Sequence, residues 1–169
     1  TIGAGGMGRV YRARHTRLDR RFAIKVLHPE LSMQESTVLR FHREATAISR
    51  LSHHNVVRVV DFGELDDGLL YLVMELVDGR SLRDILRADG PLPADRILEL
   101  LGQICDGLAH AHRHGLVHRD FKPENVVVER HVDGEHARIA DFGIAADVAA
   151  QRIPTDGLVP GTPSYMAPE

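Results

Sequence analysis

The sequence predicts an α+β fold in which an antiparallel, β-rich first part is followed by a mainly helical second part. Residues 20–27, RRFAIKVL, alternate in the manner of a strand, and the turn signal DDG at 66–68 separates two further strands. From Pro93 onward apolar residues recur at helical spacing. The segment VDG, Val77–Gly79, marks the break between the two parts.

Composition narrows the class of protein. The 169 residues are 43% hydrophobic and 27% charged with a formal net charge of −3, which is typical of a globular domain and argues against a dedicated nucleic-acid binder. The longest uninterrupted apolar run, Leu69–Met74, is too short to span a bilayer, so we expect no membrane contact within this segment. Because Cys105 is the single cysteine, an internal disulfide is excluded and a reducing, cytoplasmic compartment is favoured.

The first part is expected to contain a hairpin, a helix and a second pair of strands. Strands are predicted at Val10–Ala13 and in RRFAIKVL, and then at Val56–Glu64 and Leu69–Leu76. In RRFAIKVL the predicted apolar face holds Phe22, Ile24 and Val26, and the opposite face holds Ala23, Lys25 and Leu27. A helix is predicted over Glu35–Leu51, with the apolar stripe Val38, Phe41, Ala45 and Ile48.

The second part is expected to contain two helices and a hairpin. The first helix covers Ser81–Ala88 with Ser81 as N-cap, and the longer one runs from Pro93 to the C-capping Gly115. Its predicted apolar positions are Ile97, Leu101, Ile104, Leu108 and Ala111, with Cys105 in the core. A hairpin is predicted from Val126–Val128 and Ala137–Ala140.

Two histidines on the longer helix invite a metal-binding interpretation. His110 and His114 lie four residues apart, but no acidic residue stands between them in the manner of a zinc motif. A solvated last turn, where histidine suits the helix dipole, is the favoured interpretation.

Near the N-terminus, Gly3, Gly5, Gly8 and Val10 form a G-x-G-x-x-G-x-V pattern. A dinucleotide-binding fingerprint shares these glycines but opens a helix, whereas this loop continues into a strand. The context favours a hairpin that covers a nucleotide. Taken alone, the pattern also fits a glycine-rich turn that binds nothing.

A lysine on a strand and a glutamate on the first helix suggest an ion pair. Lys25 shares its strand face with the small residue Ala23, which suits a flat ring and its phosphates. Glu44 borders the apolar stripe of the helix and would be costly to bury without a cation. Lys25 is the natural partner, although each residue alone also fits a solvated surface charge.

The strongest local signal is HRDFKPEN, His118–Asn125, followed by DFG, Asp141–Gly143. Mg²⁺ prefers hard oxygen ligands, and Asn125 and Asp141 flank the predicted hairpin, from which they can supply them. Asp120 is not needed as a metal ligand and is therefore expected to interact with an attacking hydroxyl group.

Together, GAGGMGRV, AIK, HRDFKPEN, DFG and APE resemble the protein-kinase signature set in its required order, over the whole chain. Lys122 and the segment GTPSYMAPE are similar to the serine/threonine branch, and GAGGMGRVYRA is similar to the bacterial eukaryotic-like (Hanks-type) kinases. The resemblance implies a two-lobed fold with an N-lobe over 1–74, a hinge over 75–79 and a partial C-lobe over 80–169 that carries the catalytic loop and the activation segment. It further implies ATP and Mg²⁺ as cofactors and a protein Ser/Thr hydroxyl as acceptor.

The resemblance also assigns roles to individual residues. The nucleotide contacts it implies are Gly3, Gly5, Gly8, Val10, Ala23, Lys25, Met74 as gatekeeper, Glu75, Val77 and Val127. The catalytic set comprises Asp120 as base, Lys122 at the γ-phosphate, and Lys25 paired with Glu44, while Asn125 and Asp141 bind the metal. Regulation would involve Arg119, Thr155 as a phosphorylated residue of the activation loop, and Thr162 supporting Asp120 and Lys122.

Some features depart from the family pattern or lie beyond this sequence. Ala146 replaces a commonly basic residue, which weakens the implied phosphate-dependent control, and Phe121 stands in place of leucine. We interpret the sequence as a kinase domain truncated at both ends, whose parent chain has room for a sensor or transmembrane region. The alternatives are a nucleotide-binding pseudokinase or regulatory module, which intact Lys25, Asp120, Asn125 and Asp141 disfavour, and an inactive kinase fragment.

Overall fold

A computed structural model of the chain describes residues 1–142 and Tyr165. The described residues divide into two compact units, of which the first comprises Thr1–Arg50 and Arg58–Leu76. The second unit comprises Leu51–Val57 and the residues from Val77 onward. Within the described part of the chain, no helix is long and apolar enough to cross a membrane.

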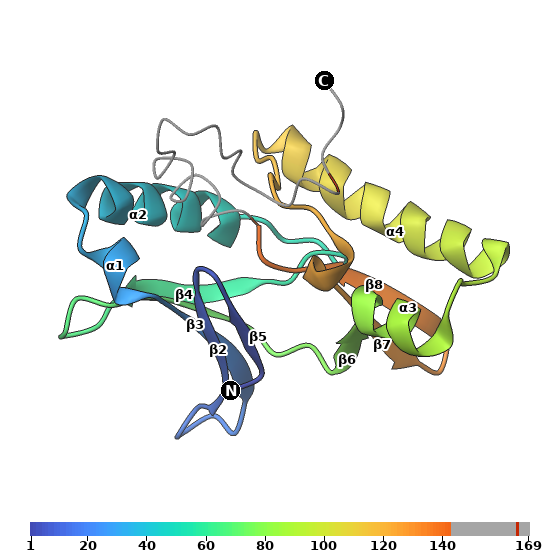
Figure 1. The fold of residues 1–169 in the computed structure, drawn as a ribbon, viewed down its shortest axis with the longest axis horizontal. Coiled ribbons are helices and arrows are strands. Elements are labelled where there is room, and N and C mark those ends of the chain that lie inside the picture. The colour runs from blue at the N-terminus through green and yellow to red at the C-terminus, as the bar shows by residue number, and fades with distance from the viewer. Residues whose placement is uncertain (143–164, 166–169) are drawn as a thin grey trace. The chain divides into compact units, whose positions relative to one another are not determined.

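The first unit is built on a five-stranded antiparallel sheet with the strand order β1-β2-β3-β5-β4. The strands are β1 Gly3–Gly5, β2 Gly8–Arg14, β3 Arg21–Leu27, β4 Val59–Glu64 and β5 Leu70–Glu75. Two helices accompany the sheet, α1 Pro29–Ser32 and α2 Glu35–Ser49, and α2 lies along one of its faces (Figure 1). The predicted DDG turn is confirmed, since Gly68 has φ 82° and donates its N–H to the carbonyl of Leu65 at 2.8 Å.

The buried face of β3 is the opposite of the predicted one. Ala23 and Leu27 are buried, whereas Phe22, Ile24 and Val26 are only half-buried. The register explains this difference, because Ala23 pairs with Met74 and Lys25 with Leu72, so these side chains share one face. The same face contacts α2, where the rings of Phe41 and Phe62 meet edge to face at 6.3 Å. Burial therefore follows the position of α2 and not the local hydrophobicity of the strand.

Helix α2 agrees with its predicted stripe except at one position. Phe41, Ala45 and Ile48 are buried as expected, but Thr37 takes the place predicted for Val38, which is half-buried. Both residues lie within helical spacing of Phe41, so the sequence pattern does not decide between them.

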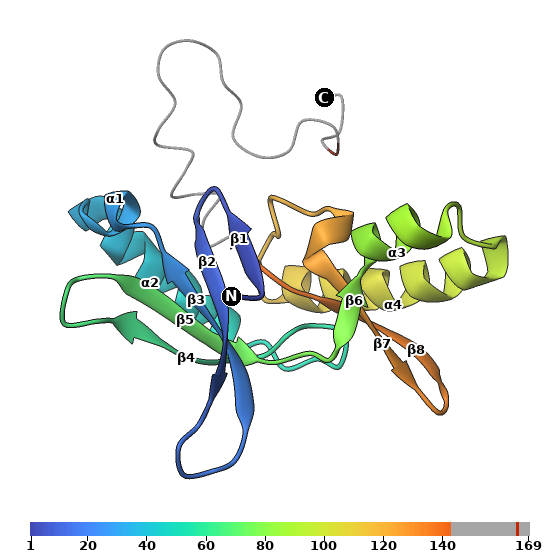
Figure 2. The same ribbon diagram turned by 60° about the horizontal axis from the view of Figure 1, so that its bottom comes forward.

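The second unit combines helices with a three-stranded sheet of order β6-β7-β8. Its elements are β6 Gly79–Ser81, α3 Leu82–Asp89, α4 Ala94–Arg113, a 3₁₀ turn at Pro123–Asn125, β7 Val126–His131 and β8 Gly134–Ile139. Helix α4 packs along the β7–β8 hairpin at β8 (Figure 2). Ser81 caps α3 as predicted, since its hydroxyl accepts the Asp84 N–H at 3.0 Å.

The predicted strand from Val56 begins only at Val59, because the preceding residues pair with the second unit. Asn55 accepts the N–H of Ile139 at 2.8 Å, and the carbonyl of Ile139 accepts the N–H of Val57 at 2.8 Å. These bonds satisfy the outer edge of β8, which would otherwise leave polar backbone groups unpaired in the core.

Helix α4 buries a face that only partly overlaps the predicted one, since Ile104 and Ala111 are buried as predicted and the other predicted positions are not. Its buried residues are Leu100, Ile104, Gly107 and Ala111. Ile97 and Leu101 are 40% and 48% exposed, Cys105 is exposed rather than in the core, and Leu108 is half-buried. Both stripes have helical spacing, and Gly107 selects the buried one because only a residue without a side chain fits against Asn55 and Ile139. The helix ends as predicted, with Gly115 at φ 72° and the Leu116 N–H bonded to Ala111.

Substituting the two glycines of α4 tests this packing. A Cβ at Gly107 would lie 3.0 Å from the Asn55 carbonyl oxygen and 2.9 Å from Cδ1 of Ile139, whereas one at Gly102 would meet nothing within 4 Å. We expect Gly107→Ala to lower the free energy of unfolding by about 1–2 kcal/mol, because overpacking exceeds the gain in helix propensity. Gly102→Ala should raise it by about 0.5–1 kcal/mol. Denaturant titration measures both, and equal stabilisation by the two variants would contradict the assigned face.

Candidate active site

The loop before β7 brings Asp120 and Lys122 together. The Nζ of Lys122 lies 2.6 Å from Oδ2 of Asp120, and the two side chains are 22% and 18% exposed. From the sequence, Asp120 was expected to interact with an attacking hydroxyl group. In the structure its carboxylate is also paired with the ammonium group of Lys122. A carboxylate held beside an ammonium group can accept a proton from a hydroxyl while the ammonium stabilises negative charge nearby.

Asn125 fixes the shape of this loop from within. Its side chain is buried, and its Nδ2 donates to the carbonyl oxygen of Asp120 at 2.8 Å. Its backbone N–H also bonds to the carbonyl of Lys122 at 2.9 Å. The predicted metal ligand therefore also positions the predicted base, and donation from the amide nitrogen defines the amide oxygen as its remaining ligand atom.

The backbone of Ala140 connects this loop to Asp141. The N–H of Ala140 donates to the carbonyl of Asn125 at 2.8 Å, and Nε2 of His118 donates to the carbonyl of Ala140 at 3.0 Å. Asp141 then takes φ 55°, and Arg119 takes φ 63°. Such left-handed conformations cost of order 1–3 kcal/mol for a non-glycine residue and persist only where the surroundings impose them.

His118 is buried among rings as well as hydrogen-bonded. Its ring centroid lies 4.8 Å from that of Phe142 and 5.6 Å from that of Phe121. Burial lowers the pKa of His118, although the hydrogen bond to Ala140 and the charge of Asp141 oppose the shift. The ring is therefore neutral at pH 7 and keeps Nε2–H as its donor.

Asn125 and Asp141 fit a magnesium site. Both supply hard oxygen atoms, and the bond between Ala140 and Asn125 brings their backbones together in one unit. Among the described residues no group of three or more His, Cys, Asp or Glu side chains could hold a metal ion. Two protein ligands completed by substrate phosphates are a common arrangement for Mg²⁺.

In the first unit, the glycine-rich segment forms the predicted hairpin of β1 and β2. Gly3 pairs with Val10 and Gly5 with Gly8. A Cβ at Gly8 would lie 2.2 Å from the carbonyl oxygen of Val26, so this glycine is required by packing against β3. At Gly5 nothing lies within 4 Å of such an atom.

The register places several predicted nucleotide contacts on one face of the sheet. Val10 pairs with Lys25, and Ala23 pairs with Met74. Ala23 and Met74 are buried, while Val10 and Lys25 are half-buried. Glu44 is half-buried on α2, and its ion pair with Lys25 stays a prediction.

The remaining predicted contacts lie at strand ends. The N–H of Glu75 donates to the carbonyl of Arg58 at 3.0 Å, and its Oε1 accepts the Arg58 N–H at 2.7 Å. Val77 begins the second part of the chain, and Val127 is half-buried on β7 opposite Arg138. Gly143, Ala146, Thr155 and Thr162 lie outside the described residues.

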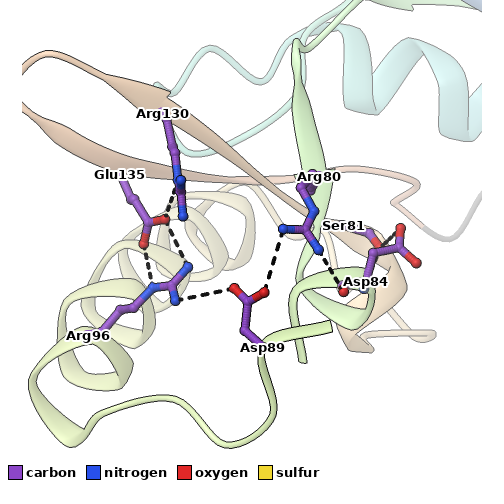
Figure 3. Close-up of polar contacts among 7 residues, drawn as sticks. All are labelled: Arg80, Ser81, Asp84, Asp89, Arg96, Arg130 and Glu135. Atoms are coloured by element: carbon purple, nitrogen blue, oxygen red, sulfur yellow. Dashed lines mark hydrogen bonds and ion pairs between the residues drawn. The ribbon is translucent and has the colours of Figure 1, made fainter. Parts of the chain in front are cut away.

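A polar network that sequence reasoning missed anchors the β7–β8 hairpin at its far end (Figure 3). Arg96 of α4 binds Glu135 of β8 through Nε at 2.7 Å and Nη2 at 2.9 Å, and Arg130 adds a contact at 3.3 Å. Arg96 also lies 3.9 Å from Asp89, which lies 3.8 Å from Arg80. The hairpin is thus fixed at the end opposite to the one that carries Asn125 and Asp141.

Gln103 and Asn55 hold the same hairpin along its edge. Oε1 of Gln103 accepts the N–H of Ala137 at 2.8 Å, and its Nε2 donates to the carbonyl of Glu135 at 2.9 Å. Nδ2 of Asn55 donates to the carbonyl of Ala137 at 2.8 Å. A polar Gln103 among the apolar residues of α4 is the sequence signal that could have marked this contact.

Comparison with known proteins agrees with this architecture. The family model for the protein kinase domain matches residues 1–169, so the chain belongs to the protein kinase domain family. The predicted recognition and two-lobed fold class are thereby confirmed.

Particular relatives are bacterial serine/threonine kinases. The chain is 49% identical over 171 residues to serine/threonine-protein kinase pkn2 of Myxococcus xanthus, covering 99% of this chain and 20% of that protein. The crystal structure of the Mycobacterium tuberculosis PknI kinase domain superposes with a TM-score of 0.74 at 35% identity, over 85% of this chain and 58% of that one. A structure of Rad53 1–466 in complex with AMP-PNP gives a TM-score of 0.74 at 29% identity, over 85% of this chain and 36% of that one.

Removing the charge of Glu135 tests the anchor of the hairpin. Its hydrogen bonds with Arg96 hold the pKa of Glu135 below its usual 4.5, so this contribution to stability is present above pH 4.5 and is lost as pH falls through the lower value. We expect Glu135→Gln to lower the free energy of unfolding by about 1–2 kcal/mol at pH 7, with the difference shrinking below about pH 4.5.

Asp19 offers a matched control for this prediction. It pairs with Arg14 at 2.7 Å, but the two side chains are 72% and 80% exposed. Asp19→Asn should change the free energy of unfolding by less than about 0.5 kcal/mol. Equal losses in the two variants by denaturant titration would mean that the network in Figure 3 contributes no more than a surface pair.

Proposed function

We propose that the protein is a serine/threonine kinase that transfers the γ-phosphoryl group of ATP to a Ser or Thr hydroxyl of a protein. The observation that carries this proposal is the connected geometry of the second unit. Asn125 bonds to the carbonyl of Asp120 and, through its own carbonyl, to Ala140, so the pair Asp120–Lys122 and the residue Asp141 are held by one set of bonds.

In the proposed reaction, the substrate hydroxyl oxygen attacks the γ-phosphorus and its proton passes to the carboxylate of Asp120. The bond between the γ-phosphorus and the β,γ-bridging oxygen breaks, and ADP leaves with that electron pair. Lys122, whose Nζ lies 2.6 Å from Oδ2 of Asp120, stabilises the charge of the transferring group.

The proposed metal site consists of Asn125 and Asp141. Mg²⁺ bound there would neutralise the charge of the nucleotide phosphates. The bond between the Ala140 N–H and the carbonyl of Asn125 keeps the backbones of the two ligand residues together before any ion is bound. This preorganisation lowers the entropy lost when the ion and the phosphates bind.

The proposed nucleotide contacts follow the family pattern. Gly3, Gly5 and Gly8 would cover the phosphates, Lys25 with Glu44 would bind the α- and β-phosphates, Val10, Ala23 and Val127 would contact adenine, and Met74, Glu75 and Val77 would line its edge. Support comes from the shared face of Val10, Ala23, Lys25 and Met74 and from the AMP-PNP complex of the related Rad53. Because the Glu75 N–H is engaged by Arg58, we assign the adenine edge to the carbonyl of Glu75 and the backbone of Val77.

The chain spans 20% of pkn2, so the setting of the whole protein also belongs to the proposal. We propose a cytoplasmic signalling kinase with a protein substrate, whose parent chain accommodates a sensor or transmembrane region. Arg119 would bind a phosphate on Thr155, and Thr162 would support Asp120 and Lys122.

Substitution of Asp120 tests the activity in the complete kinase domain. Asp120→Asn should lower the rate of phosphate transfer to a generic protein substrate by about a hundredfold or more, while ATP binding with Mg²⁺ changes little. Asp133→Asn, in the β7–β8 turn where the side chain is 74% exposed, is the matched control and should keep the rate of the unmodified protein. Binding of ATP without transfer in the unmodified protein would instead indicate a pseudokinase.

Substitution of Thr155 tests the proposed regulation. It is the only hydroxyl-bearing residue between Gly143 and Gly161 in the sequence. Any phosphate that mass spectrometry of the autophosphorylated protein finds between these two glycines should therefore be on Thr155. Thr155→Ala should lower the transfer rate with nearly unchanged ATP affinity. If Thr155→Ala is fully active and the unmodified protein carries no phosphate on Thr155, the proposed binding of that phosphate by Arg119 is wrong.

A further inference from the structure

Four histidine rings form a continuous chain of ring contacts in the second unit, in which one pair is stacked and two pairs are tilted. His53 and His54 stack at a centroid distance of 4.3 Å, His53 lies 4.9 Å from His110, and His110 lies 4.5 Å from His114. The first two belong to the segment 51–57, and the others lie near the C-terminal end of α4. The sequence predicted a solvated last turn here, but His110 is half-buried and its Nε2 is buried without a hydrogen-bond partner among the described residues.

One ring of this histidine chain, His53, is held in a defined protonation state by its hydrogen bond. Nδ1 of His53 accepts the backbone N–H of Asn55 at 3.2 Å. An imidazole nitrogen accepts a hydrogen bond only when it carries no proton, so His53 is neutral with its proton on Nε2. Protonation of His53 would place a hydrogen on Nδ1, directed at the N–H of Asn55, and would break this bond.

Asn55 transmits the state of His53 to β8. Its Nδ2 donates to the carbonyl of Ala137 at 2.8 Å and to Oε1 of Gln103 at 3.2 Å, and its carbonyl accepts the Ile139 N–H at 2.8 Å. Ile139 is the last residue of β8, and Asp141, the proposed metal ligand, stands two residues later. Release of Asn55 would therefore loosen the strand end that places Asp141.

The surroundings of His53 oppose its protonation. Burial and the neighbours His54 and His110 lower its pKa below 6.5, with a smaller contribution from Arg113, while Asp106 on α4 acts in the other direction. Burial, His114 and Arg113 likewise lower the pKa of His110. From β8, Arg138 donates to the carbonyl of Val56 at 3.3 Å and adds positive charge beside the segment.

We propose that His53 is a positioning residue whose neutral imidazole holds Asn55 and, through it, the end of β8 that places Asp141, so that acidification releases this arrangement and lowers phosphoryl transfer. The expected effect of acidification on phosphoryl transfer rests on the proposed kinase function. Because the folded state binds fewer protons than the unfolded state below pH 6.5, the stabilisation is complete above that pH and is lost as pH falls through the lower pKa of His53.

The structural step can be tested without any kinase activity. In the complete kinase domain, the ¹⁵N–¹H resonances of Asn55 and Ile139 should shift together between pH 7.5 and 5, with a midpoint below 6.5. One pH unit below that midpoint, the neutral form of His53 is outnumbered about tenfold. In His53→Asn, whose side-chain oxygen can replace Nδ1 as an acceptor that does not titrate, this joint shift should disappear. His112→Asn, at an exposed position of helix α4, should behave like the unmodified protein.

The functional step is tested by the pH profile of phosphate transfer. His53→Asn should retain the transfer rate at pH 7.5 and lose less of it than the unmodified protein at pH 5.5, whereas His53→Ala should be impaired at both values because it has no acceptor. If the amide resonances of Asn55 and Ile139 do not shift with pH, the proposal is wrong. It is also wrong if His53→Asn loses as much transfer activity at acidic pH as the unmodified protein. Titration of both resonances in a protein that transfers no phosphate at any pH would support the structural step and reject the kinase function.

Discussion

The backbone N–H and carbonyl of Ala140 make the contacts on which the proposed catalytic geometry depends. The N–H bonds to the carbonyl of Asn125 and the carbonyl accepts Nε2–H of His118, so the residue before Asp141 is joined to both the beginning and the end of the catalytic loop. Arg119 and Asp141, which follow His118 and Ala140 in the chain, both adopt left-handed conformations. Burial in this ring cluster lowers the pKa of His118, so the ring that donates Nε2–H to Ala140 is neutral.

The edge of β8 imposes a second constraint. A strand that packs beside α4 cannot leave its outer N–H and C=O groups unpaired. The chain satisfies them with residues 55–57 and with the side chains of Asn55 and Gln103. This explains why a segment that lies between two elements of the first unit packs with the second unit, and why Gly107 has no side chain.

In the first unit, the register of the strands determines which side chains share one face of the sheet. Val10, Lys25 and Leu72 stand opposite one another across three strands, and Ala23 stands opposite Met74. This face is also the one that contacts α2, so packing and proposed nucleotide recognition use the same side of the sheet. A small residue at position 23 beside a lysine is compatible with both requirements.

The sequence by itself determined the fold class, the order of the longer strands and helices, the turn at Gly68, the cap at Ser81, the end of α4 at Gly115 and the family, because glycine, serine and short motifs act through local geometry. The short elements α1 and β6 were not predicted. Only the tertiary structure decided which face of β3 and of α4 is buried, and that Cys105 is exposed. Alternating and helical patterns in this chain each offer two apolar faces, and the choice depends on what packs against them. The bonds of Asn55, Gln103 and Arg96 likewise join residues far apart in the chain, and no local pattern specifies such partners.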